Sequence, residues 1–223
     1  MIWTAATAPI LLALLATGAT AATQAPTVLT VMAEHAAEVC SSGETPTRVN
    51  GVPPCEALSN LTGMVGFADG AQRAEVLIRW VDVVAVPCAS PSPPTSTAQR
   101  RPGVGPAGPA LTAQPPSPPS PVVRVAACDA ALVWLTRFEA AMTDDRSRVD
   151  VAPALFLIVG QIHQIRGEAL ATMDGGPSAR ACEAFGAARE AVRRIDMWSW
   201  YAQARSSFPL AIAEVEAAGA TCR

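Results

Sequence analysis

Histidine is the side chain most often used as a general base or metal ligand near neutral pH, and this chain has only two. His35 lies in the segment EHAAE, where Glu38 follows one helical turn later, so the two side chains could share a metal. Further ligands would have to come from elsewhere in the chain. We therefore expect His35 to lie on the solvated polar face of a short helix. We expect His163 to lie beside an apolar core, or within it with its hydrogen bonds satisfied.

The short motifs of the common enzyme classes are absent from the sequence. There is no GxSxG, no P-loop, no HExxH and no CxxC. The stretch GVGPAG follows no strand and lies among prolines, so it cannot present a helix N-terminus to phosphate. We predict that the protein is not an enzyme and has no catalytic residues, no metal site and no cofactor.

The cysteines carry the strongest chemical signal. An even number of cysteines behind an export signal is typical of disulfide bonds, here three. The sequence leaves their connectivity open, and pairing of neighbours along the chain is the simplest hypothesis. The six are Cys40, Cys55, Cys88, Cys128, Cys182 and Cys222.

The N-terminal stretch MIWTAATAPILLALLATGATAATQA predicts the export signal. Its apolar centre is followed by small residues, and Ala19-Thr20-Ala21 fits a signal-peptidase site. A membrane span needs about 20 apolar residues, so we favour a cleaved signal peptide over residues 1–22 rather than a membrane anchor. No other segment is long enough to span a membrane. We expect a secreted protein, with a periplasmic location as the alternative.

One segment has the composition of a protein interface. Tryptophan, tyrosine and arginine are enriched at interface hot spots, and AREAVRRIDMWSWYAQARSSF combines all three. Neighbouring residues on a helix point about 100° apart, so its aromatic side chains cannot all face one apolar seam. The alternative is that the chain after Pro209 buries the tryptophans. The predicted interface residues are Arg189, Arg193, Trp198, Trp200 and Tyr201.

Apolar residues recur at helical spacing along most of the chain, which predicts an all-α protein. Single amphipathic segments of this length are not stable alone, so we predict a disulfide-braced bundle of four to five helices. Asp69-Gly70 is expected to divide the second segment, and Asp150 to cap the fourth. The expected helical segments cover residues 27–40, 55–86, 122–142, 150–174, 178–208 and 209–219.

Residues 89–121 interrupt this pattern with prolines, serines and glycines. Proline fixes φ and removes a backbone donor, so we predict a disordered insertion, closed into a loop if Cys88 pairs with Cys128. A PxxP ligand and an O-glycosylated stretch are alternative roles for it. The flanking parts, residues 23–88 and 122–223, are expected to form one domain.

Two short stretches resemble known families. EAVRRIDMWSWYAQ, around Asp196 and Trp200, resembles the last helix of interleukin-10-type four-helix cytokines. GMVGFADG, between Cys55 and the Pro87-Cys88 pair, resembles a stretch of small periplasmic immunity proteins of the Rap1a/Tai type. Both resemblances imply a protein that binds another protein. No functional residue is transferred from either family.

These observations together predict a secreted helical bundle that acts by non-covalent binding to a protein, such as a receptor or host factor. The form expected is an extracellular ligand, cytokine-like or decoy; a periplasmic or envelope binding or immunity-type protein is the first alternative, and an enzyme the second. The NLT sequon makes Asn60 a candidate glycosylation site. The net charge of −3 and the scattered arginines argue against a nucleic-acid partner, which requires a concentrated basic stripe.

Overall fold

Helices account for nearly all of the backbone that the structure describes. The computed structural model describes residues 26–42, 51–89, 119–196 and 209–222. These residues contain seven α-helices and no β-strand, so the all-α prediction is confirmed for them. The elements are α1 (Val28–Ser41), α2 (Pro54–Val65), α3 (Gly70–Ala89), α4 (Pro121–Ala141), α5 (Arg148–Asp174), α6 (Ala179–Asp196) and α8 (Pro209–Ala217), with 3₁₀ turns η1 (Met142–Asp144) and η2 (Ala220–Cys222).

The predicted count of four to five helices is too low. Residues 55–86 form two helices, divided before Gly70 as expected, because the chain leaves α2 after Val65 and Gly70 starts α3 with a φ of +45°. The segment after Pro209 is also a helix of its own, α8.

Polar side chains define where several helices begin. Thr27 Oγ1 accepts a hydrogen bond from the backbone N–H of Thr30 at 3.2 Å. Ser120 and Ser178 make the same contact to the third following N–H at the starts of α4 and α6. Gly175, with a φ of +73°, ends α5 in the left-handed conformation that glycine adopts most easily.

The N-terminus of α5 differs from the prediction. Asp150 is not the cap, because the helix already begins at Arg148 and Asp150 lies in its first turn. The η1 turn and the Asp145 carboxylate, which accepts a hydrogen bond from the Ser147 N–H, organise the chain before α5. A carboxylate in the first turn still interacts favourably with the helix dipole.

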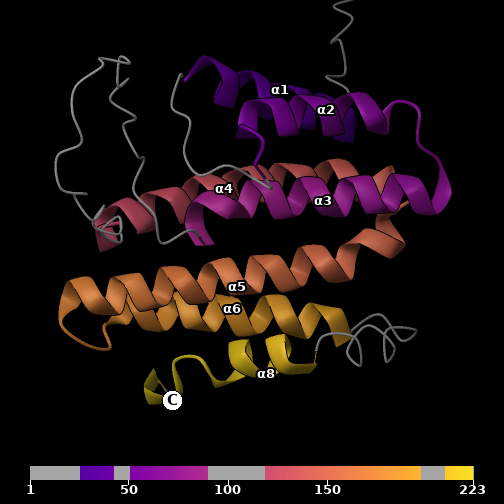
Figure 1. Ribbon diagram of the computed structural model, residues 1–223. Helices are drawn as coiled ribbons and strands as arrows, with labels where there is room; N and C mark the ends of the chain where they lie inside the picture. The colour runs from indigo at the N-terminus through magenta and orange to yellow at the C-terminus, as the bar shows by residue number, and fades with distance from the viewer. Residues whose placement is uncertain (1–25, 43–50, 90–118, 197–208, 223) are drawn as a thin grey trace, which may run out of the picture.

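The helices are stacked in layers (Figure 1). The α1–α2 pair lies on the α3–α4 pair, which lies on the α5–α6 pair, and α8 packs against α6 and α5. Each layer therefore buries its apolar stripe against the next, as amphipathic helices require. One continuous cluster of buried side chains extends from Val28 in α1 to Val215 in α8.

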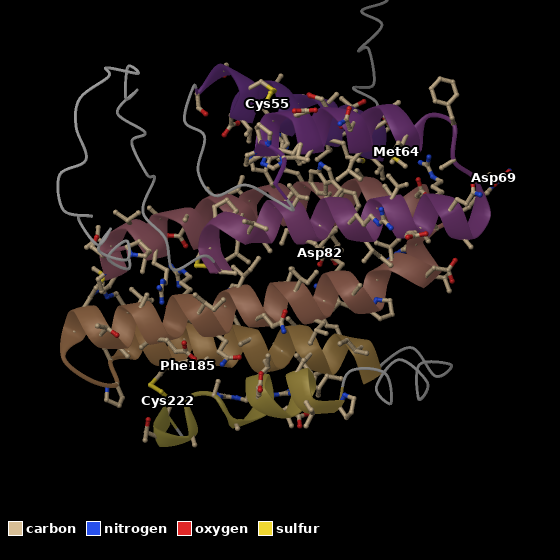
Figure 2. All side chains as sticks on the ribbon, in the orientation of Figure 1. Cys55, Met64, Asp69, Asp82, Phe185 and Cys222 are labelled. Atoms are coloured by element: carbon tan, nitrogen blue, oxygen red, sulfur yellow. A yellow bond between two sulfur atoms is a disulfide. The ribbon has the colours of Figure 1, made fainter. Side chains whose placement is uncertain are left out.

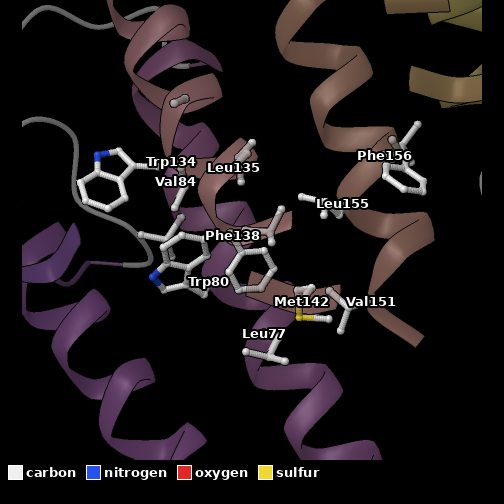
Figure 3. Packing of buried hydrophobic residues seen from close by; sticks show 14 of the residues in the cluster. Leu77, Trp80, Val84, Trp134, Leu135, Phe138, Met142, Val151, Leu155 and Phe156 are labelled. Atoms are coloured by element: carbon white, nitrogen blue, oxygen red, sulfur yellow. The ribbon is translucent and has the colours of Figure 1, made fainter. Parts of the chain in front are cut away.

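Aromatic side chains fill the interface between α3 and α4 (Figure 3). Trp80 has no exposed surface, and its ring stacks on Phe138 with centroids 4.7 Å apart. Leu155 reaches this interface from α5 (Figure 3). Burying a large aromatic side chain contributes about 2–3 kcal/mol, so this contact is a major source of stability for the middle layers.

The disulfides join neighbouring cysteines, as the simplest hypothesis predicts. Cys40–Cys55 links the end of α1 to the start of α2. Cys88–Cys128 links α3 to α4, with a Cα–Cα distance of 4.5 Å. Cys182–Cys222 ties the C-terminal turn η2 to the start of α6.

A second, smaller cluster surrounds Phe185 near the C-terminus (Figure 2). A Cβ atom on Gly167 of α5 would come within 2.8 Å of the Phe185 ring, and one on Gly219 within 2.5 Å. Both glycines therefore leave the space that the ring occupies. Gly219 also has a φ of +65°, so a side chain there would add backbone strain.

This packing predicts opposite effects for two glycine-to-alanine substitutions in helices. Gly167→Ala should lower the free energy of unfolding by about 1–3 kcal/mol, because overpacking against Phe185 outweighs the gain in helix propensity. Gly186→Ala in α6, where a Cβ meets nothing within 4 Å, should raise it by up to about 1 kcal/mol. Urea denaturation of both variants measures the difference, and an increase for both would contradict the packing of Phe185.

Candidate functional site

The two arginines predicted at an interface both have partners within the protein. Arg189 Nη1 donates a hydrogen bond to the backbone carbonyl of Ala218 at 2.9 Å. This carbonyl lies just after the end of α8 and so has a hydrogen-bond partner. Arg193 forms an exposed ion pair with Glu190 at 3.2 Å. Arg189 is half-buried, so its guanidinium contributes to holding the C-terminal segment on α6.

A pairing expected from helical spacing is not formed. Glu190 and Arg194 are four residues apart on α6, yet Arg194 pairs with Glu139 of α4. The Arg194 guanidinium also lies 4.0 Å from the centroid of the Phe156 ring. The contacts of Arg194 with α4 and α5 replace the i,i+4 ion pair, since such a pair contributes only about 0.3–0.5 kcal/mol.

The predicted aromatic interface residues Trp198, Trp200 and Tyr201 lie outside the described residues. The described chain stops at the end of α6, Asp196, and resumes at Pro209. The interface predicted for this segment therefore stays a prediction.

Asn60 lies on the surface of α2, and its side chain is exposed. It borders a hollow of about 530 Å³ that is also lined by Arg79, Asp82 and Val83 of α3. An exposed asparagine is accessible to modification, so its position is compatible with the sequon. Glycosylation of Asn60 stays a prediction.

His35 was expected on a solvated helix face, and that prediction is wrong. It is 7% exposed and packs between Trp80 of α3 and Trp134 of α4, with ring centroids 5.4 Å and 4.8 Å away. Its Nδ1 has no hydrogen-bond partner in the described chain. Burial lowers the pKa of His35 to about 4, so the ring is neutral at pH 7 and acts as a core aromatic.

No group of three or more metal-ligating side chains comes together within the described residues. His163 is half-buried on α5. Burial and then the positive charge of Arg166 lower the pKa of His163, while Asp129 acts in the opposite direction.

The most exposed large apolar side chain of the described residues belongs to Phe67, in the turn between α2 and α3. Its side chain is 96% exposed, and Met64 in the last turn of α2 is 51% exposed. Figure 2 shows Met64 and Asp69 at the same end of the molecule. We call this region, residues 64–73 together with residues 145–150, the turn end.

Two hollows share Arg73 and Asp145 at the turn end, and residues 68–70, which follow Phe67, line the first of them. The first, of about 540 Å³, is lined by Asp69, Arg73, Arg146 and Asp150 among others. The second, of about 290 Å³, lies between Arg73, Asp145 and the start of α1. The turn end therefore combines exposed Phe67 and Met64 with arginines, three residue types that are enriched at protein interfaces.

An ion pair forms the floor shared by the two hollows. Arg73 donates to Asp145 at 2.6 Å and to the backbone carbonyl of Val65 at 2.9 Å. Burial alone would raise the pKa of Asp145, but hydrogen bonds from Arg73 and Ser147 and the charge of Arg73 outweigh it and lower that pKa. The guanidinium thus connects the end of α2, the start of α3 and the turn before α5.

None of the site residues predicted from the sequence lies in the turn end. A signal was present, because GMVGFADG places methionine and phenylalanine among glycines where one helix ends and the next begins. An apolar residue in a turn between helices does not belong to the apolar face of either helix. Its exposure to solvent could therefore have been predicted from the sequence.

Comparisons with known proteins add no functional assignment. No protein family, curated protein or solved structure matches this chain. Among the helices of the described residues, none is both long and apolar enough to cross a membrane.

The burial of His35 predicts a loss of stability in mild acid. In the unfolded chain His35 binds a proton below about pH 6.5, but in the folded chain only below about pH 4. Acidification between these values therefore favours unfolding, by up to about 3 kcal/mol. Urea denaturation at pH 7 and pH 4.5 should show this loss, and His35→Phe, which keeps an aromatic ring without the titration, should reduce it. An equal loss in the variant would place the titrating group elsewhere.

Proposed function

We propose that this protein is exported and binds another protein non-covalently through the turn end. The observation that carries the proposal is the almost complete exposure of Phe67, in a turn whose residues 68–70 line the hollow around Arg73. A buried phenylalanine contributes about 1.5–3 kcal/mol relative to an exposed one. A partner that covers this ring would gain that free energy.

The way in which the turn is held supports the same proposal. Arg73 of α3 binds the carbonyl of Val65 across the turn, and Asp145, from the segment before α5, pairs with the same guanidinium. A ring presented by a fixed turn loses less conformational freedom on binding than one on a mobile segment. Phe67 therefore has the properties of a preorganised anchor at the centre of a binding surface.

The location outside the cytosol belongs to the same proposal. All six cysteines are in disulfides, which persist in oxidising compartments and are rare in the cytosol. The predicted signal peptide over residues 1–22 lies outside the described residues. A secreted ligand or decoy is the form we propose, and a periplasmic binding or immunity protein is the alternative.

We expect substitution of the exposed ring to abolish partner binding and to leave the fold intact. The mature chain, with a photo-crosslinking side chain introduced at position 69, is incubated with extracellular fluid or envelope material of the source organism. One crosslinked protein should be recovered, and Phe67→Ser should lose it without a change in melting temperature. Val133→Ser, which replaces another exposed apolar side chain, on α4 and 59% exposed, is the control and should recover the same protein.

Equal recovery by Phe67→Ser and the unsubstituted chain would rule out the turn end as the binding surface. Recovery only of a second copy of this chain would also contradict the proposal, because it would identify the surface as a self-association contact.

Export makes a separate prediction about the covalent state of the chain. Expressed with its leader in an exporting host, the chain recovered outside the cytosol should begin near Thr23. Its mass should also correspond to three closed bridges, as in the structure. Intact-mass spectrometry before and after reduction measures both. A chain that still carries Met1, with free thiols, would contradict export.

A further inference from the structure

A groove on another face of the molecule has a different chemistry. It runs over α5 between α3 and α8, and its volume is about 410 Å³. Asp82 and Glu214 contribute two carboxylates to its lining, and Gln161 and Gln164 contribute two amides. Isoleucines of α5, including Ile158 and Ile165, provide apolar surface between them. We call this feature the acidic groove.

The two carboxylates of the acidic groove have no cation of their own. No arginine is among the residues that line it, and neither Asp82 nor Glu214 belongs to an ion pair within the described part of the chain. Arg79, which lies one helical turn before Asp82, is paired with Glu75 at 2.5 Å. The groove is therefore a concentration of negative charge that the described residues do not neutralise.

The surroundings of Asp82 make its charged form costly. Partial burial raises the pKa of the Asp82 carboxyl, in contrast to Asp145, where Arg73 outweighs the same effect. A cation placed in the groove would act on Asp82 as Arg73 acts on Asp145. Charge complementarity therefore indicates that the occupant of the groove is positively charged.

We propose that the acidic groove binds a segment of a partner protein that carries an arginine or lysine next to an apolar side chain. The cation lies between Asp82 and Glu214, where charge-assisted hydrogen bonds are stronger than neutral ones. The apolar neighbour packs on Ile158 and Ile165, and the amides of Gln161 and Gln164 contact the backbone of the segment. This second site is separate from the turn end, since Asp82 and Met64 lie apart along the α2–α3 layers (Figure 2).

The test uses the full mature chain and a defined probe, a fluorescein-labelled peptide of sequence Ala-Leu-Arg-Ala-Leu-Arg-Ala. Fluorescence anisotropy should show saturable binding that weakens with added salt, because the attraction is electrostatic. The same peptide with glutamate in place of arginine should not bind. The Asp82→Asn, Glu214→Gln double variant should weaken binding by about tenfold or more.

Two controls separate the groove from general charge and from folding. The Glu56→Gln, Glu183→Gln double variant removes the same charge from exposed positions on α2 and α6, and should bind the peptide as the unsubstituted chain does. Asp82 and Glu214 both keep surface in contact with solvent, so the melting temperature of the groove variant should be unchanged or higher. Phe67→Ser should keep peptide binding, which distinguishes this site from the proposed function of the turn end.

Three results would overturn the proposal. The first is no binding of the arginine peptide, or equal binding by the groove variant and the unsubstituted chain. The second is peptide binding that appears only after Arg100→Ala, Arg101→Ala, which would identify the chain's own residues 90–118 as the occupant. The third is self-association in sedimentation velocity that the groove variant loses, which would identify a second copy of the chain.

Discussion

The contact between α3 and α4 is the one on which the other layers depend. It brings Trp80 onto Phe138 and is closed at one end by the Cys88–Cys128 bridge. The α1–α2 pair packs on one side of it and α5 on the other, so loss of this contact would leave both without a complete partner. The two helices are separated in the chain by a proline-rich stretch that has no apolar periodicity of its own. Their association therefore depends on the aromatic packing and the bridge rather than on a short connection.

Periodicity and turn chemistry were enough to predict most of the fold. Apolar spacing identified the helical segments, and Asp69-Gly70 correctly marked the break between α2 and α3. The boundary at Asp150 was missed because the structure before α5 depends on the η1 turn and on contacts of Asp145 with a distant helix. Helix α4 shows a further limit, since Val122, Val123 and Val133 are exposed although they are apolar, so composition alone does not define its inward face.

The candidate sites were harder to predict, because they depend on which helices meet. His35 is buried only because Trp80 and Trp134, on helices far along the chain, enclose it. Arg189 and Arg193 were singled out by composition, yet the first is occupied by the Ala218 carbonyl and the second by Glu190. Phe67 and the acidic groove become visible only when exposure and the packing of α3, α5 and α8 are known. Sequence reasoning could identify residues capable of binding, but not those left available for it.

The order of the disulfides has a consequence for biosynthesis. Each bridge joins a cysteine to the next one along the chain, so no bridge encloses or crosses another. A polypeptide that enters an oxidising compartment from its N-terminus can therefore close each bridge before the next pair of thiols arrives. Thiols that oxidise in the order in which they emerge then form the native bridges. The chain therefore has little need of an isomerase to exchange wrongly paired sulfurs.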